Sequence, residues 1–127
     1  MERLKQRADF MAAAGALKVP SAGFVLQARN RSDQGPARVG FTVSRKVGNA
    51  VERNRVRRRL REIVRLRSTG ALRPGHDYVL VGRRAALSAA FSDLAADYDR
   101  AITRIHTMRP KNTARPEPKP SRQPPDP

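Results

Sequence analysis

The sequence predicts a small α+β domain in the order α-β-β-α-β-α, with the helices packed on one face of the sheet. Three observations support this fold class. Three segments place apolar residues at helical spacing, two segments alternate polar and apolar residues, and one short run is almost wholly apolar. The chain has 127 residues, a length typical of one domain. We expect the folded domain to cover residues 1–108.

The end of the chain differs in composition from the rest. Residues 109–127 hold seven of the ten prolines and no aliphatic or aromatic residue larger than alanine. Such a segment cannot bury enough apolar surface to offset the entropy lost on ordering. We therefore expect a disordered, basic, proline-rich tail over these residues.

The first half of the domain is expected to hold one helix and two strands. Residues 6–14 are rich in alanine and are followed by Gly15, a common helix stop. Residues 23–30 and 38–44 alternate polar and apolar side chains with period two, as half-buried strands do. The residues between them are mostly Asn, Ser, Asp, Gly and Pro, which favour turns. We expect these two strands to pair as an antiparallel hairpin.

The second half is expected to hold two helices with a strand between them. Asn49 and Glu52 have the spacing of a capping box, so a helix begins there and runs to about residue 67, with Gly70 closing it. Residues 76–82 are almost continuously apolar, which suits a strand buried on both faces. A last helix over residues 88–106 has apolar residues at helical spacing, namely Phe91, Leu94, Ala95, Tyr98, Ile102 and Ile105.

The charge of the chain points to a polyanionic partner. Lys and Arg number 27 against 11 Asp and Glu, a formal net charge of +16. Such an excess repels itself unless a polyanion or salt neutralises it, so nucleic acid is the first candidate and an anionic membrane surface the second. No apolar run approaches the ~20 residues of a spanning helix, the first residues contain no signal-peptide pattern, and there is no cysteine. We expect a cytoplasmic protein.

The helix over residues 52–67 is the strongest candidate for the contact with nucleic acid. It contains eight arginines and two glutamates. At about 100° per residue, its apolar side chains form one stripe, and the opposite side carries a continuous polar row. We call this row the arginine ribbon; it consists of Asn54, Arg57, Arg58, Arg61 and Arg65. An ordinary solvated face mixes both signs of charge, whereas Arg without partners suits bidentate phosphate contacts.

The segment before this helix adds to the basic surface. Arg45 and Lys46 follow the second strand, and Gly48 allows either a simple turn or a close approach of the backbone to a ligand. The amides of residues 49–51 open a helix N-terminus, which is a favourable place for a phosphate group.

Residues 43–62 resemble one known family closely. They read Val-Ser-Arg-Lys-Val-Gly-Asn-Ala-Val-Glu-Arg-Asn-Arg-Val-Arg-Arg-Arg-Leu-Arg-Glu. The bacterial ribonuclease P protein component carries a basic Val-Gly-Asn-Ala-Val segment that leads into an Arg-Asn-Arg motif and a basic helix. Here the motif stands at Arg53, Asn54 and Arg55. The resemblance extends to shorter matches at residues 8–10, 23–26, 38–40 and 91–94, and so covers about residues 3–106.

The resemblance implies both a fold and a function. The implied fold is a mixed sheet of the ribosomal protein S5 domain 2-like type, with a left-handed crossover between parallel strands. The implied function is that of the protein subunit of the ribonuclease P ribozyme, which binds the catalytic RNA subunit and the 5′ leader of precursor tRNA. In this family the RNA hydrolyses the phosphodiester with Mg²⁺. The resemblance thus implies no catalytic residue, no metal tightly bound by the protein, and neither DNA nor membrane as partner.

The resemblance also assigns roles to particular residues. The catalytic RNA is expected to contact Arg45, Lys46, Gly48, Asn49, Arg53, Asn54, Arg55, Arg57, Arg58, Arg61 and Arg65. The leader is expected to contact Arg7, Phe10 and Gln27. Two positions depart from the family, which often has aromatic residues where this chain has Ala14 and Gln27, so we expect a weaker or different grip on the leader. Phe10 is off the apolar stripe of its helix if the helix begins near Arg3, and is a core residue if the helix begins later.

Other functions find less support in the sequence. A protein nuclease would need a general base or metal-binding carboxylates, but His76 and His106 show no partner pattern, and Asp97 and Asp99 cannot share a helix face. A DNA-binding module would be expected to show a helix-turn-helix, zipper or zinc pattern, and none is present. A ribosomal or other architectural RNA-binding protein is the alternative that composition leaves open.

Overall fold

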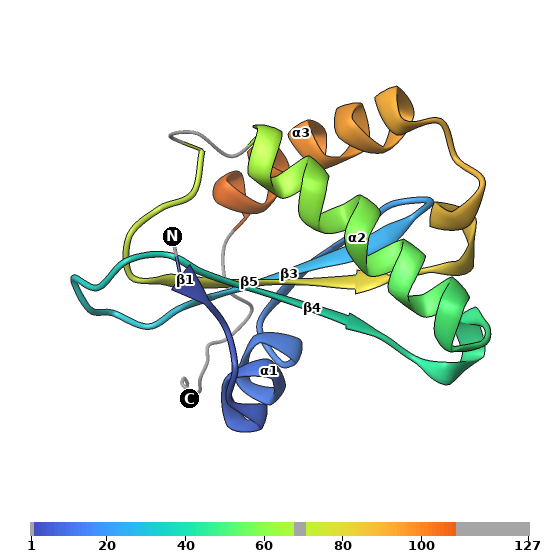
Figure 1. The fold of residues 1–127 in the computed structure, drawn as a ribbon. Coiled ribbons are helices and arrows are strands. Elements are labelled where there is room, and N and C mark those ends of the chain that lie inside the picture. The colour runs from blue at the N-terminus through green and yellow to red at the C-terminus, as the bar shows by residue number, and fades with distance from the viewer. Residues whose placement is uncertain (1, 68–70, 109–127) are drawn as a thin grey trace, which may run out of the picture.

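The computed structural model describes residues 2–67 and 71–108, so the expected tail and the helix stop at Gly70 lie outside the described residues. The described residues form a five-stranded sheet and three α-helices (Figure 1). The elements are β1 (Glu2–Arg3), α1 (Arg7–Ala14), β2 (Leu17–Pro20), β3 (Phe24–Asn30), β4 (Arg38–Val43), α2 (Ala50–Arg67), β5 (His76–Gly82) and α3 (Phe91–Thr107). Two 3-10 turns precede α2 and α3, at Arg45–Val47 and Arg84–Leu87. The α+β class is confirmed.

The strands of the sheet follow the order β1-β4-β5-β3-β2. β5 is antiparallel to β3 and parallel to β4, so the sheet is mixed, as the resemblance implies. The expected hairpin is wrong, because β5 lies between β3 and β4 and pairs with both. Alternation shows which side chains face the core, but it does not identify the neighbouring strand. β1 and β2 were not predicted, since strands of two and four residues are too short to show a period.

The helices lie on both faces of the sheet. α2 and α3 cover one face and α1 covers the other (Figure 1). The expectation of a single helical face is therefore wrong for α1. The alternation of β5 explains why: Tyr78 and Leu80 lie in the main core with α2 and α3, whereas Val79 packs with Leu4 and Ala13 beneath α1. A strand that is apolar on both faces needs cover on both.

The last helix begins three residues later than expected, after the 3-10 turn at Arg84–Leu87. Five of its six expected apolar positions are buried. Phe91 is the exception, with 38% of its surface exposed, because it is the first residue of α3.

Candidate RNA interface

The start of α2 is fixed by a reciprocal pair of hydrogen bonds. The Glu52 amide donates to the side-chain oxygen of Asn49 at 2.9 Å, and the Asn49 amide donates to the Glu52 carboxylate at 3.0 Å. This is the predicted capping box. The hydrogen bond from the Asn49 amide holds the pKa of the Glu52 carboxyl below its usual value, with Arg84 assisting, so Glu52 stays charged at the helix N-terminus.

The same capping box explains Gly48. Its φ of 157° is outside the range that side chains favour, and a Cβ at this position would clash with the Glu52 carboxylate. Gly48 thus makes room for the cap. The amide of Asn49 is already bonded, and the Glu52 carboxylate lies beside it. The sequence predicted a phosphate at the amides of this helix end. At Asn49, such a phosphate would have to compete with the Glu52 carboxylate for the amide.

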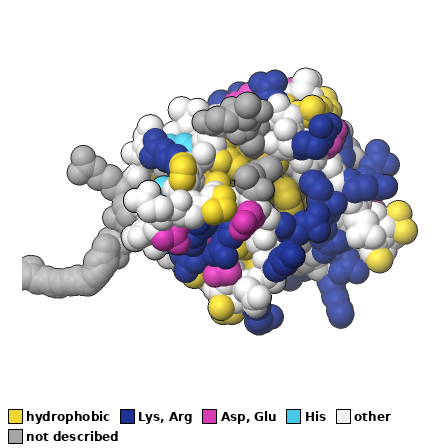
Figure 2. Space-filling view, turned by 60° about the vertical axis from the view of Figure 1, so that its left-hand side comes forward, with side chains coloured by type: hydrophobic (Ala, Val, Ile, Leu, Met, Phe, Trp, Pro, Cys, Tyr) yellow, Lys and Arg dark blue, Asp and Glu magenta, His cyan; other side chains and the backbone are white. Residues whose placement is uncertain are grey.

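The body of α2 is amphipathic as predicted. Val56, Leu60, Ile63 and Val64 are buried in the main core. The opposite side is lined with arginines, and the space-filling view shows Lys and Arg side chains gathered broadly on one side of the molecule (Figure 2). Similar charges at this density repel one another in the absence of a partner.

Some arginines of α2 are bound within the protein. Arg59 donates three hydrogen bonds to backbone carbonyls, to Ala86 at 2.6 Å, Leu87 at 3.1 Å and Ala89 at 2.6 Å. Arg59 therefore joins α2 to the turn before α3. Arg67 pairs with Asp99 on α3. Neither residue was assigned to RNA by the sequence.

The residues assigned to RNA make fewer contacts within the protein than Arg59 and Arg67 do, but they differ among themselves. Within the ribbon, Arg65 pairs with Glu62 at 2.6 Å, and Arg57 donates to the side chain of Asn54 at 2.9 Å. Arg53, which is half-buried, makes only a long contact of 3.5 Å to the Asn49 carbonyl.

Four of the assigned cations make no side-chain hydrogen bond, ion pair or ring contact within the described part of the chain. They are exposed and lie in the 3-10 turn and on α2: Arg45, Lys46, Arg55 and Arg58. Exposed cations without partners can neutralise phosphates without first breaking an ion pair. Together with Arg61, these residues are the part of the surface most available to a polyanion.

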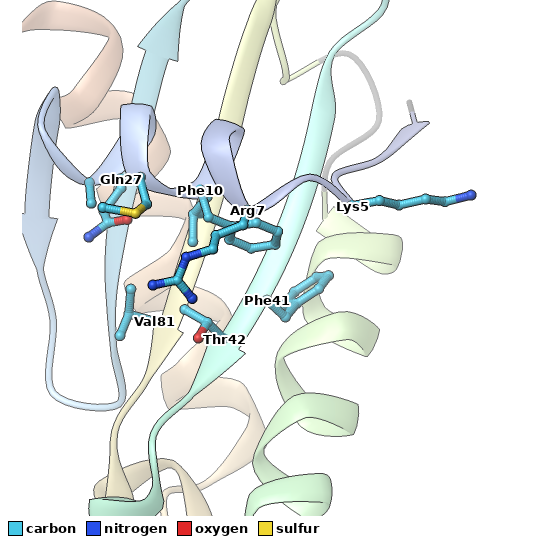
Figure 3. Close-up of a pocket in the computed structure, with 10 residues that line it drawn as sticks. Lys5, Arg7, Phe10, Gln27, Phe41, Thr42 and Val81 are labelled. Carbon is cyan, nitrogen blue, oxygen red and sulfur yellow. The ribbon is translucent and has the colours of Figure 1, made fainter.

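A groove lies between α1 and the sheet. Its volume is about 580 Å³, and its lining includes Lys5, Arg7, Phe10, Gln27, Phe41 and Val81 (Figure 3). The structure therefore brings together Arg7, Phe10 and Gln27, the three residues assigned to the leader. Arg7 and Phe10 extend from α1 over the sheet, whereas Gln27 lies on β3. Ala14 and Gln27, where the resemblance led us to expect aromatic residues, line the groove with non-aromatic side chains.

Phe10 combines the two roles that the sequence left open. It is half-buried and packs against Leu4, Ala13 and Val79, yet it also lines the groove. Its ring lies on the backbone of Gly40, where a Cβ would come within 2.5 Å of the ring. Gly40 therefore permits the ring to approach β4 closely while it still lines the groove.

Sequence reasoning missed Phe41 as a site residue. The period of β4 placed it with Val39 and Val43 on the core side, and it does pack against the main core. However, Phe41 is half-buried at the outer side of β4 and lines the groove as well. The guanidinium of Arg61 lies 5.7 Å from the centre of its ring, within cation–π range. No signal in the sequence of β4 alone could show that its outer side is open.

Sequence reasoning also missed an ion cluster at one end of the sheet. Asp77 is fully buried and accepts hydrogen bonds from Arg29 at 2.8 Å, Arg31 at 2.5 Å and Arg38 at 2.8 Å. Although burial raises it, the three guanidinium groups lower the pKa of Asp77 to about 2. Asp9 on α1 also pairs with Arg29 at 3.3 Å and with Arg38 at 3.4 Å. The cluster thus links α1, which carries Phe10, to the end of the sheet.

The two histidines form a structural contact. The Arg73 amide donates to the Tyr78 hydroxyl at 3.0 Å, and the same hydroxyl shares a hydrogen bond of 2.7 Å with His106 Nε2. Burial lowers the pKa of His106, with Arg73 and His76 assisting, which favours the neutral ring. Among the described residues, no group of three or more His, Cys, Asp or Glu could hold a metal ion.

A small α+β domain with exposed, unpaired arginines on one helix and an aromatic groove beside them has the features of an RNA-binding protein. Comparison with known proteins identifies the family. The family model described as Ribonuclease P matches residues 1–106. A ribonuclease P protein component of Gluconacetobacter diazotrophicus is 52% identical over 101 residues, which span 79% of this chain and 87% of the relative. One of Ruegeria pomeroyi is 48% identical over 111 residues, 84% of this chain and 88% of the relative.

Solved structures agree. The ribonuclease P protein of Thermotoga maritima has a TM-score of 0.69 at 29% identity, covering 83% of this chain and 98% of that one. The Staphylococcus aureus protein has a TM-score of 0.68 at 26% identity, covering 81% and 94%. The chain belongs to the ribonuclease P protein family. In the part of the chain that the structure describes, no helix is long and apolar enough to cross a membrane.

Proposed function

We propose that this protein is the subunit that binds the catalytic RNA of ribonuclease P and the 5′ leader of precursor tRNA, helping to remove that leader. The single observation that carries the proposal is that one chain of this family combines a surface of unpaired cations with a groove lined by aromatic residues. Arg45, Lys46, Arg55 and Arg58 are exposed and unpaired among the described residues, and they suit a folded RNA rich in phosphates. The groove with Phe10 suits a flexible single strand.

In this proposal the RNA subunit carries out the hydrolysis with its own Mg²⁺. The protein contributes binding: it neutralises phosphates of the catalytic RNA and holds the leader in an extended form. Binding of the leader would favour precursor over mature tRNA, which has no leader. We further propose that the protein works in the cytoplasm, and that it recognises neither DNA nor a membrane.

Cleavage of precursor tRNA by the reconstituted enzyme tests the proposal. Adding the protein to the cognate catalytic RNA should lower the Mg²⁺ concentration needed for cleavage at the mature 5′ end, while the protein alone should cleave nothing. Cleavage at that site by the protein without RNA would overturn the assignment of the chemistry. Tight binding to ribosomal RNA without any effect on cleavage would instead favour an architectural role.

A further inference from the structure

The outer side of β4 is open over most of its length. β1 pairs only with Arg38 and Val39, and within the described ranges no other strand lies beyond β4. The open part of this edge carries Phe41, which lies between β4 and α2 (Figure 3). A single strand that follows the groove beneath α1 can therefore leave it across this edge, beside the segment that joins β1 to α1, without displacing a paired strand of the described sheet.

A second hollow begins where the groove ends. Its volume is about 240 Å³, and it lies between β1, β4 and α2. Phe41 lines both hollows, so its ring connects them. The far wall of the second hollow is formed by Arg61 and Arg65 of α2. The groove, Phe41 and α2 thus form one path from the proposed leader site to the arginine ribbon.

The side chains around Phe41 suit a nucleotide. Phe41 offers a flat apolar ring, and the Arg61 guanidinium lies over it. A base can stack on either plane, and the guanidinium is free to neutralise a phosphate because no carboxylate pairs with it within the described residues. Arg3 on β1 adds a further exposed positive charge to the lining of the hollow, and Glu2 is the one carboxylate in that lining. The charge of Arg65 is already balanced by Glu62. The net charge of the hollow is therefore positive.

We propose that Phe41 and Arg61 form a nucleotide-binding subsite at the β4 edge, occupied by a leader nucleotide that lies beyond the groove. The proposal rests on the function proposed above and extends it. The resemblance led us to expect aromatic residues at Ala14 and Gln27 of the groove. The proposed subsite supplies an aromatic contact, Phe41, in a chain that lacks them. It also gives Arg61 a role in substrate binding that differs from the role of Arg58, which has no aromatic neighbour within cation–π range among the described residues.

The test uses the reconstituted holoenzyme and precursor tRNAs whose leaders are lengthened one nucleotide at a time. For the unmodified protein, affinity should rise in a step when the leader becomes long enough to reach Phe41. Phe41→Leu keeps an apolar side chain but removes the aromatic face, and Arg61→Gln removes the guanidinium without touching the core. With assembly saturated by excess catalytic RNA, each should remove this step, a loss of about tenfold for long leaders relative to short ones. Phe91→Leu and Arg104→Gln, both exposed on α3, are the matched controls.

A second measurement identifies the occupant. 2-Aminopurine placed at the leader position of the step should be quenched by stacking in the unmodified holoenzyme and should regain fluorescence in Phe41→Leu. The proposal is overturned if the step persists in both variants, if short and long leaders lose affinity equally, or if Phe41→Leu impairs assembly with the catalytic RNA. If the unmodified holoenzyme shows no preference for leader-bearing over mature tRNA, the proposed function fails as well; a retained preference without the step removes the subsite alone.

Discussion

Arg58 and Arg59 are neighbours in sequence but have different surroundings. Arg58 is exposed, whereas Arg59 is bound to three carbonyls of the segment before α3. Hydrogen bonds from a charged donor contribute more than neutral ones. We expect Arg59→Ala to lower the free energy of unfolding by about 2 kcal/mol while leaving RNA affinity nearly unchanged below the melting transition. Arg58→Ala should do the reverse. Thermal melts and RNA titrations of both variants check this; equal effects on stability would contradict it.

Phe10 is expected to serve stability and binding together. Because its ring is half-buried on Gly40, Phe10→Ala should cost about 2 kcal/mol of stability, less than a fully buried Phe. It should also weaken binding of leader-bearing tRNA to the holoenzyme. Phe10→Leu separates the roles, since it retains most of the packing but not the stacking face. If Phe10→Leu keeps the full preference for precursor over mature tRNA, the ring does not stack on the leader.

Residue roles were predictable where the signal is local. The capping box of Asn49 and Glu52 covers four consecutive residues and was predicted correctly from sequence. The role of Arg59 depends on carbonyl groups that lie 27 to 30 residues away along the chain. The ion pairs of Asp77 depend on arginines that lie 39 to 48 residues away. No pattern along the chain indicates such partners. The Asp77 cluster exists because the fold brings the ends of β3, β4 and β5 together, and the Arg59 contacts exist because α2 packs against the segment before α3.

At the scale of elements, α2 presents its charge as one surface. We expect replacement of Arg55 and Arg58 by Ala to reduce the slope of log affinity for the catalytic RNA against log salt by about two, because each lost phosphate contact removes about one released counterion. Lys18→Ala with Arg104→Ala removes the same charge from exposed positions on β2 and α3 and should leave the slope unchanged. A slope that both double variants reduce equally would indicate diffuse attraction to the whole molecule.

Element types were predictable and pairing was not. The helices α1, α2 and α3 and the strands β3, β4 and β5 were all predicted from composition, periodicity or an apolar run in the sequence. The strand β5 even matched at both ends, His76 and Gly82. The predicted hairpin was wrong because a turn-rich linker can also join two strands that are separated in the sheet by a third one. Here β5 lies between β3 and β4. The groove exists because α1 is the one described helix on its face of the sheet. The amphipathic pattern of each element shows which of its sides is apolar, but it does not show which face of the sheet a helix covers.

For the whole molecule, the ion cluster around Asp77 makes stability depend on acidity. The folded pKa of about 2 lies below the ordinary value of 3.8, so the folded state favours the charged form. This contribution is fully present above pH 3.8 and is lost as pH falls toward 2, and it amounts to about 2 kcal/mol. Chemical unfolding between pH 6 and pH 2 should show this loss. Asp77→Asn should be less stable at pH 6, by about 3 kcal/mol or more because three arginines lose their partner, and should show a flatter dependence on pH.

The position of β5 between β3 and β4 also determines when the sheet can form. During synthesis, β3, β4 and the arginine-rich α2 all leave the ribosome before β5. Until then, β3 and β4 have no central strand between them, and α2 has no complete sheet to pack on. In a fragment of residues 1–73, the amides of β3 and β4 that bond to β5 should therefore show no protection in hydrogen exchange, whereas in the full chain they should. Pairing across such long separations is slow. The newly made chain thus presents its basic helix before it has a folded core, and RNA that binds early would meet an unfolded protein.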